Sequence, residues 1–532
     1  MAGWTMAANV QYTATIGGPD NVLPDQEDET AFEALKPRLA QLWADVFPAD
    51  DQPYTSVVVP SMSVDADDLA RAQHLRFYEE ILLFLLIRLR NPHARVVYLT
   101  SQPIPGPIID YYLHFLAGIP ASHAAARLTL LSTYDGSPRP LTLKILERPR
   151  LIQRIRAAIP DRSRAYLTVL RATPLERRLA VALYVPLNAA DPKMDALCRK
   201  SGARQILKEA GLSVAHGYED LRDEDDLVDA LQALQRDRPA LRRAIVKVDS
   251  SYWDEGTALL RLPEEFPAPR EALRRSLTEL ETPTGEPSAT FLGRFSRLGG
   301  VVEECIEARH RADASVQLRI NPRGKVFLTS THDEVQTGPF RLMSRGSLFP
   351  ADEAYRIRLQ DAGLRVGEVL AARGLVSRVS IEFLLSRDDP GDEWQMIAHD
   401  INLGVGGATH PLLAVRFLTG GELDRRTGLF VSPAGKPKFY RSTDYLESPR
   451  WRGLLPDDLI EALTLNHLNY SQHGEAGALF YMLGAISELG RVGVVAIGNS
   501  RVEADAVFGR VVQTLDRMCG ATEGGNEGGI GR

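Results

Sequence analysis

Cysteine is scarce in this chain of 532 residues, which contains only Cys198, Cys305 and Cys519. These residues are far apart and form no C-x-x-C pair, so the sequence offers neither a disulfide framework nor a cysteine zinc site. We therefore expect a reducing, cytoplasmic compartment.

Long apolar runs are also missing. The most apolar stretch, residues 81–89, is much shorter than the roughly 20 residues that a membrane helix needs. The first residues lack a basic segment followed by an apolar core, so no secretion signal is expected. We expect residues 1–54 to be a flexible acidic leader and the glycine-rich residues 519–532 to be a disordered tail.

The chain also has no surplus of basic residues: it contains 62 Lys and Arg residues and 69 Asp and Glu residues, which give a net charge of -7. Without a basic stripe, the sequence argues against nucleic acid as a partner. The apolar fraction of 44% and the length predict two or three separate lobes.

Segments of strand and helix type alternate in the first third of the chain, which predicts a parallel α/β sheet. Its strands are expected at 56–59, 94–100, 127–132 and 165–170, with helices at 69–90, 108–117 and 141–159. The segments 300–306, 315–320, 325–330, 377–385 and 394–401 predict one antiparallel sheet, with a helix at 355–373. A C-terminal unit follows, with helices at 456–466, 476–489 and 501–518 and a strand at 493–497.

Two lysines are candidates for phosphate binding. Lys200 opens a helical segment, and Lys247 ends the apolar strand AIVKV. A buried ammonium is costly without an anion, so Lys247 should meet one at the rim of the sheet. A salt bridge or a surface position is the alternative for each lysine.

Glutamates stand inside the apolar segment VVEECI, at Glu303 and Glu304. Such acids need hydrogen-bond donors, which adenine and ribose offer. An edge strand that alternates inward and outward explains one of them without a ligand.

Two acids stand in predicted strands: Glu382 in SIEFLL and Asp400 in MIAHDINL. Asn402 comes two positions after Asp400. The period of two puts Asp400 and Asn402 on one face. Two carboxylates and an amide oxygen suit Mg²⁺, which bridges nucleotide phosphates; ordinary polar strand ends are the alternative.

A glycine-rich turn at 404–407 could form an anion nest. His410 is a candidate catalytic residue, although a histidine before a proline is more often structural.

Taken in order, these residues resemble the signature of the ATP-grasp superfamily. More narrowly, the chain is similar to the peptide ligases related to the pheganomycin ligase, through SMSVD, ARVVYLTSQPI, GGATHPLLAVRFLTGG and GAISELGRVGVVAIG, and this similarity spans almost the whole chain. The resemblance implies an α/β fold with a pre-ATP-grasp domain at 55–197, an α+β ATP-grasp core at 198–420 and a C-terminal domain at 421–518.

The resemblance also implies roles for individual residues. It gives phosphate contacts to Lys200 and Lys247, nucleotide contacts to Glu303, Glu304 and Ile306, and Mg²⁺ or Mn²⁺ to Glu382, Asp400 and Asn402. It places Gln317, Arg319, His332 and Asp333 at the same site.

The chain departs from the family pattern at three positions. Asp400 and Gly404 stand where many ATP-grasp enzymes have glutamate and arginine, and the loop SSYWDEGTA after Lys247 offers only Gly256. Either Arg319 or Arg416 is expected to take over from the missing arginine in steadying an acyl phosphate, or the activity is altered.

The implied activity is ATP-dependent joining of a carboxylic acid to an amine through an acyl phosphate, with release of ADP and phosphate. The substrates would be a small amino or guanidino acid and an amine or peptide. The resemblance also suggests a homodimer. Residues 250–257 would close over the site. One alternative is a non-catalytic ATP-binding homologue. A dinucleotide-dependent oxidoreductase is disfavoured, because no GxGxxG follows a predicted strand.

Overall fold

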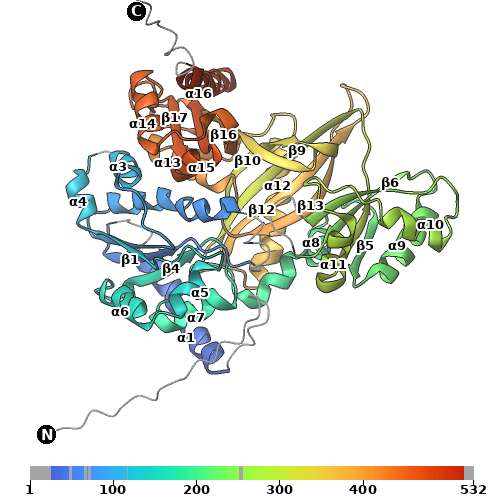
Figure 1. Ribbon diagram of the computed structural model, residues 1–532, viewed down its shortest axis with the longest axis horizontal. Helices are drawn as coiled ribbons and strands as arrows, with labels where there is room; N and C mark the ends of the chain where they lie inside the picture. The colour runs from blue at the N-terminus through green and yellow to red at the C-terminus, as the bar shows by residue number, and fades with distance from the viewer. Residues whose placement is uncertain are drawn as a thin grey trace, which may run out of the picture.

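The computed structural model describes residues 26–46, 51–64, 69, 73–116, 118–250 and 256–520. The strands of these residues form three sheets. In Figure 1 a small lobe (green) lies at one side of a long central sheet (yellow and orange), and the N-terminal sheet (blue) and the last helices (red) lie at the other side.

The N-terminal sheet is parallel, as predicted, with the order β3-β2-β1-β4. Its two inner strands are apolar and almost fully buried, because helices cover both faces of the sheet. The elements are β1 (Tyr54–Val59), η2 (Gln73–Glu80), η3 (Leu83–Arg90), β2 (Ala94–Thr100), α3 (Gly106–His114), α4 (Ala121–Ala125), β3 (Leu128–Ser132), α5 (Leu141–Leu146), α6 (Pro149–Ala157), η4 (Arg162–Arg164), β4 (Ala165–Val169) and α7 (Pro174–Leu183).

Two predicted helices of this unit are broken. The single helix expected at 141–159 is two helices, because Arg148 before Pro149 takes φ -122° and ψ 81° and leaves the helical region. The helix expected at 69–90 consists, in its described part, of two 3₁₀ segments, η2 and η3; residues 70–72 lie outside the described residues.

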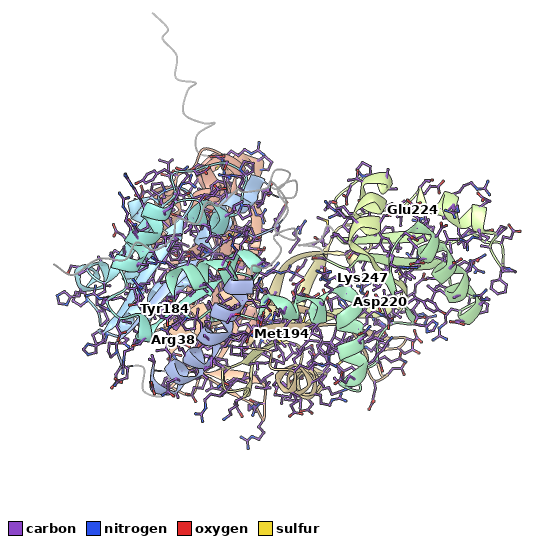
Figure 2. All side chains as sticks on the ribbon, turned by 90° about the horizontal axis from the view of Figure 1, so that it is seen from below. Arg38, Tyr184, Met194, Asp220, Glu224 and Lys247 are labelled. Atoms are coloured by element: carbon purple, nitrogen blue, oxygen red, sulfur yellow. The ribbon has the colours of Figure 1, made fainter. Side chains whose placement is uncertain are left out.

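Part of the expected flexible leader is ordered. Helix α1 (Gln26–Val46) buries Leu39, Leu42 and Val46 against Tyr166 of β4. Figure 2 shows Arg38 beside Tyr184, and its guanidinium lies 4.8 Å from the centre of that ring. The prediction of a flexible leader is therefore wrong for this helix, and residues 1–25 lie outside the described part of the chain.

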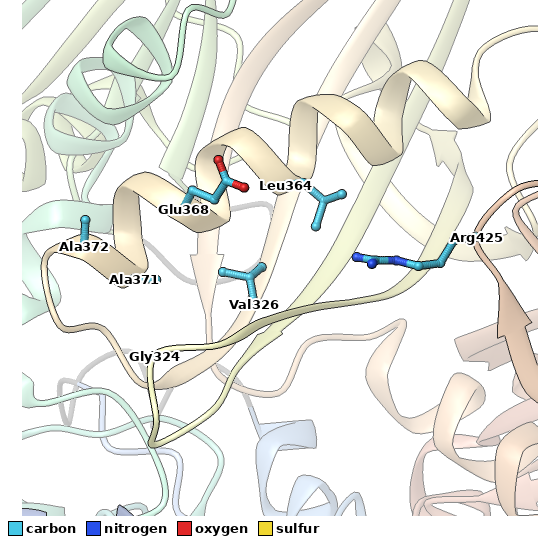
Figure 3. A pocket seen from close by; sticks show the side chains of 7 residues that line it. All are labelled: Gly324, Val326, Leu364, Glu368, Ala371, Ala372 and Arg425. Atoms are coloured by element: carbon cyan, nitrogen blue, oxygen red, sulfur yellow. The ribbon is translucent and has the colours of Figure 1, made fainter.

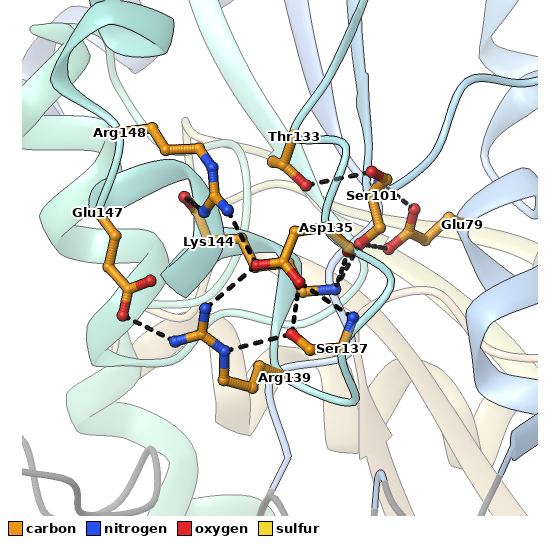
Figure 4. Close-up of polar contacts among 9 residues, drawn as sticks. All are labelled: Glu79, Ser101, Thr133, Asp135, Ser137, Arg139, Lys144, Glu147 and Arg148. Atoms are coloured by element: carbon orange, nitrogen blue, oxygen red, sulfur yellow. Dashed lines mark hydrogen bonds and ion pairs between the residues drawn. The ribbon is translucent and has the colours of Figure 1, made fainter.

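A polar network closes the carboxyl ends of β2 and β3 (Figure 4). The buried Lys144 donates to Ser101 Oγ at 2.9 Å and to the Asp135 carbonyl at 2.8 Å. Glu79 accepts from the Ser101 hydroxyl at 2.6 Å, and Asp135 pairs with Arg148 at 2.9 Å. These contacts fix the loop after β3, so this network is a structural one.

The small lobe is an antiparallel sheet with the order β5-β8-β6-β7, covered by helices. Strand β8 was expected in the long sheet, but it pairs with β5 and β6 instead; alternation within a strand does not specify its partner. The elements of the small lobe are β5 (Gly217–Leu221), α9 (Glu224–Asp237), β6 (Arg243–Val248), β7 (Thr257–Arg261), α10 (Arg270–Leu277), α11 (Ser288–Leu298) and β8 (Gly300–Glu304). The preceding η5 (Pro192–Cys198) and α8 (Lys200–Glu209) pack against the long sheet.

The long sheet is antiparallel, and helix α12 covers one face of β9 and β10. Gly363 and Gly367 of α12 permit this close packing, because a Cβ on either one would lie under 3 Å from Val316 or Leu318. The strands of this part are β9 (His310–Ile320), β10 (Val326–Thr337), β11 (Met343–Phe349), β12 (Ser377–Arg387), β13 (Gln395–Leu403), β14 (Glu422–Asp424), β15 (Leu429–Val431) and β16 (Pro437–Glu447). The helices are η7 (Pro339–Arg341), α12 (Arg356–Ala372) and α13 (Thr409–Thr419).

The C-terminal strands continue this sheet, because β18 pairs with both β16 and β17. A helix was predicted at 476–489, but Gly477–Tyr481 is the fully buried strand β17, and only the short η9 and α15 that follow it are helical. A short apolar run buried on both faces fits either structure, so periodicity could not decide. The elements are η8 (Pro449–Trp451), α14 (Pro456–Leu465), β17 (Gly477–Tyr481), η9 (Leu483–Ala485), α15 (Ile486–Leu489), β18 (Arg491–Gly498) and α16 (Arg501–Gly520). Among the described residues, no helix combines the length and apolarity needed to span a bilayer.

Candidate active site

Two carboxylates and an amide meet on the face of the long sheet that α12 leaves uncovered. In the ladder between β12 and β13, Glu382 lies opposite Asp400, and Ser380 lies opposite Asn402. The Asn402 amide donates to Glu382 Oε1 at 2.8 Å and more weakly to Asp400 Oδ2 at 3.3 Å. The structure therefore brings together the three residues that were predicted to bind a metal.

The electrostatics of this pair call for a cation. Burial, together with the neighbouring charges of Asp400 and Glu334, raises the pKa of Glu382 above its ordinary value. Burial also acts to raise the pKa of Asp400, but the ammonium of Lys200 outweighs it and holds that pKa below its ordinary value. Two adjacent carboxylates cannot both ionise readily without positive charge nearby.

This donor set fits Mg²⁺. No cluster of three or more His, Cys, Asp or Glu ligands is present among the described residues. Mg²⁺ commonly binds to only one or two carboxylates and takes its other ligands from water and nucleotide phosphates. Glu382, Asp400 and the Asn402 amide oxygen are suited to hold it in this way.

The two predicted phosphate lysines reach this site from two elements: Lys200 from α8, which packs against the long sheet, and Lys247 from β6 of the small lobe. Lys200, at the start of α8, donates from Nζ to Asp400 Oδ2. The Lys247 ammonium lies 2.6 Å from Glu303 Oε2 and 3.5 Å from the carbonyl of His399 on β13. Figure 2 shows Lys247 on the side of the small lobe that faces the rest of the molecule. The acidic pair thus lies at the junction between the two sheets.

The two glutamates of β8 point in opposite directions, as strand alternation requires. Glu303 is buried and bridges Lys247 and Arg204. Glu304 accepts from the backbone of His216 at 2.9 Å and pairs with Arg238 at 3.2 Å. Protein groups therefore satisfy both carboxylates, and the predicted nucleotide contacts of these residues and of Ile306, just after β8, stay predictions.

Sequence reasoning missed Arg204. This residue is 2% exposed, and besides Glu303 it contacts Glu219 at 3.1 Å and the carbonyl of Ala215 at 2.9 Å. Its position one helical turn after Lys200 is the only local signal that could have indicated it.

Gln317 lies in the middle of the same face. Its amide donates to Ser380 Oγ at 3.2 Å and accepts from Thr409 Oγ1 at 3.4 Å. In the sheet register it stands opposite Ser380, which is itself opposite Asn402. The structure thus ties the start of helix α13 to the strands that carry the acidic pair.

Two predicted site histidines are buried among aromatic rings. His410 stacks on Tyr481, with ring centroids 4.0 Å apart, and meets the edge of Phe84 at 5.2 Å. Neither of its ring nitrogens has a partner among the described residues, and burial lowers its pKa to about 3. His332 is likewise buried and shares a hydrogen bond of 2.5 Å with Tyr440 Oη. This environment does not support His410 as an acid or base.

Asp333 does not face the site. It accepts from Tyr355 Oη at 2.7 Å, next to the start of α12, and pairs with Arg501 at 3.3 Å. Because His332 and Asp333 are consecutive on β10, they point to opposite faces of the sheet. The expectation that both face one site is therefore wrong.

Gly404 has a structural reason to lack a side chain. Its φ is +92°, and a Cβ there would lie 2.3 Å from the carbonyl oxygen of Leu170. No arginine fits at this position without moving the backbone. The expected covering loop is mostly outside the described residues, which resume at Gly256 just before β7.

The two arginines expected to compensate lie beyond Gln317, away from the acidic pair. Arg319 follows Gln317 at strand spacing on β9, and Arg416 is exposed on α13.

A separate pocket of about 580 Å³ lies between α12 and the β9–β10 turn, lined by Val326, Leu364 and Arg425 among others (Figure 3). Because Val326 packs toward α12, this pocket lies on the opposite face of the sheet from the candidate site.

Comparisons with known proteins agree with this arrangement. The family described as "IQCH-like, ATP-grasp" matches residues 192–279 and 283–426, which include all three predicted metal ligands and both lysines. The L-propargylglycine--L-glutamate ligase of Streptantibioticus cattleyicolor is 28% identical over 477 residues, which cover 89% of this chain and 96% of that protein. The IQ motif-containing protein H of Danio rerio is 24% identical over 76% of this chain, and the match spans only 42% of that protein.

Solved structures show the same fold. The biotin carboxylase of Campylobacter jejuni, in complex with an ATP analogue, superposes with a TM-score of 0.52 at 12% identity, over 90% of this chain and 96% of that one. At this level of identity the likeness concerns the fold alone.

Proposed function

We propose that this chain belongs to the ATP-grasp superfamily and that it is an ATP-dependent ligase that joins a carboxylic acid to an amine through an acyl phosphate. The observation that carries the proposal is the adjacent pair Glu382 and Asp400, which lies beside Lys200 of α8 and feels the charge of Lys247 from the small lobe. The named activity of the Streptantibioticus cattleyicolor relative, which joins two amino acids, supports the same reaction class.

In the first step, an oxygen of the substrate carboxylate attacks the γ-phosphorus of ATP, the bond to the ADP oxygen breaks, and ADP leaves. Charge shifts toward the leaving oxygen, so Lys200 and Lys247 stabilise the step electrostatically. Bound Mg²⁺, held by Glu382, Asp400 and Asn402, would neutralise phosphate charge.

In the second step, the amine nitrogen attacks the carbonyl carbon of the acyl phosphate, the C–O bond to phosphate breaks, and the nitrogen loses a proton. The acyl phosphate also reacts with water, so the site between the lobes must be closed during turnover. In this proposal residues 55–197, 198–420 and 421–518 are the pre-ATP-grasp, ATP-grasp and C-terminal domains.

The proposal is tested by ADP release from Mg²⁺-ATP with a panel of amino acids, guanidino acids and short peptides. Release should require both an acid and an amine, and it should be lost in the double variant Asp400→Ala, Asn402→Ala. ATP binding without turnover in any acid and amine combination would contradict the proposal and favour a non-catalytic homologue.

A further inference from the structure

The sheet face that carries the acidic pair changes its charge along the strands. On β12, Glu382, Ser380 and Arg378 follow one another at spacings of two residues, so all three point to the same side. On the adjacent strand β9, Arg319 lies opposite Arg378, as Gln317 lies opposite Ser380. One end of this face is therefore acidic, the middle is neutral, and the other end is basic.

Two further arginines from distant parts of the chain complete the basic end. Arg88, at the end of η3, donates to the hydroxyls of Ser56 and Thr168, which belong to strands of the N-terminal sheet. Arg416 comes from α13, just after the glycine-rich turn. The name "arginine cluster" is used here for Arg88, Arg319, Arg378 and Arg416.

The arginine cluster lacks counter-ions among the described residues. The side chains of Arg378 and Arg416 form no hydrogen bond or ion pair with any described residue. Arg319 donates to the Asn188 amide oxygen and lies 5.4 Å from the centre of the Trp43 ring. Neither it nor Arg88 forms an ion pair with any described carboxylate.

Crowding of like charges accompanies this lack. Burial, and then the nearby guanidinium groups, lower the pKa of Arg319 to about 9 and that of Arg378 to about 10. The side chains of Arg88, Arg319 and Arg378 are only partly buried, and that of Arg416 is exposed. The arginine cluster is therefore accessible to solvent. Uncompensated positive charge in a partly buried place is a mark of an anion-binding site.

The nucleotide does not account for this charge. Lys200 and Lys247 stand at the acidic end, where the phosphates and the metal would lie. Glu382 and Arg378 are four positions apart on β12, which places their Cα atoms roughly 13 Å apart. The arginine cluster therefore lies on the same sheet face as the acidic pair, but apart from the place of the phosphates and the metal.

We propose that the arginine cluster is a carboxylate-binding subsite, and that one of the two substrates is an acidic amino acid. Four guanidinium groups exceed what a single carboxylate neutralises, so a ligand with two carboxylates matches them better than a neutral amino acid. This inference rests on the proposed function, because it places the subsite beside the reacting phosphate.

Calorimetric binding of L-glutamate and L-glutamine to the full chain tests the subsite without any turnover. Both titrations are made with Mg²⁺ and a non-hydrolysable ATP analogue present. L-Glutamate should bind at least about tenfold more tightly than L-glutamine, because the two differ mainly in one charge. Arg378→Ala should weaken L-glutamate binding on the order of 10- to 100-fold, while Arg378→Lys should retain part of it.

A matched variant separates this effect from a general loss of charge. Arg510→Ala removes an exposed arginine on α16, and it should leave L-glutamate binding unchanged. The affinity of each variant for the ATP analogue shows whether it is folded. Equal binding of the two amino acids, no binding of L-glutamate, or wild-type binding by Arg378→Ala would each overturn the subsite. A failure of the proposed ligase would appear separately, as absent ADP release in a protein that still binds L-glutamate through Arg378.

Discussion

Glu303→Gln removes the buried anion that holds the small lobe together next to the site. Glu303 is 3% exposed, and its carboxylate is shared by Lys247 at 2.6 Å and by Arg204. Burial acts to raise its pKa, but Lys247 and Arg204 together lower it below the ordinary value, so the carboxylate is charged in the folded protein. Removing one partner of a buried ion pair costs about 3–5 kcal/mol, because the remaining charges stay buried and uncompensated.

Hydrogen exchange measures this loss where it occurs, at the amides of Val246 and Val302, which pair between β6 and β8. The free energy of opening these strands should fall by about 3–5 kcal/mol in Glu303→Gln. Glu307→Gln is the matched control, because Glu307 also pairs with an arginine, at 2.8 Å, but is 56% exposed in its side chain, so it should cost less than about 1 kcal/mol. Equal small losses in the two variants would refute the reasoning and would leave nucleotide binding as the role of Glu303.

Three further predictions concern single residues. Lys200→Ala removes the ammonium bonded to Asp400, and kcat/KM for ATP in ADP release should fall on the order of a hundredfold; a loss under threefold would exclude a phosphate contact. Gly404→Arg introduces the arginine common in the superfamily, yet its Cβ would clash with the Leu170 carbonyl, so thermal unfolding should occur at lower temperature with no gain in ADP release, and higher activity would contradict this. Burial raises the pKa of Glu80 from 4.5 to about 7, so the folded state binds more protons between these pH values and loses about 3 kcal/mol of stability as pH rises through them. Glu80→Gln should lack that part of the loss when denaturant unfolding is compared at pH 5 and pH 7.5, and identical pH dependence in both proteins would disprove it.

The acidic pair could be predicted from the sequence because its geometry is local. Strand period fixes the shared face of Asp400 and Asn402, and the order of the motifs indicates that Glu382 is on a neighbouring strand. The parallel N-terminal sheet was predictable for the same reason, since alternation of strands and helices limits the possible topologies.

The remaining features depend on residues far apart in the chain. His410 is buried because Phe84 and Tyr481 pack against it, and no pattern around position 410 contains that information. Arg378 stands on an ordinary polar strand position, and it becomes notable only when Arg88 and Arg319 are placed beside it. Strand β8 joined another sheet for a similar reason, because pairing partners are set by the whole fold.

The most direct test of the acyl-phosphate account follows one oxygen atom. Once an acid substrate has been identified, its carboxylate is labelled with ¹⁸O, and the inorganic phosphate released with the amide product is analysed by mass spectrometry. The account predicts that each phosphate carries one ¹⁸O atom, because the carboxylate oxygen that attacks the γ-phosphorus leaves with it. Unlabelled phosphate, or label found in AMP, would contradict it.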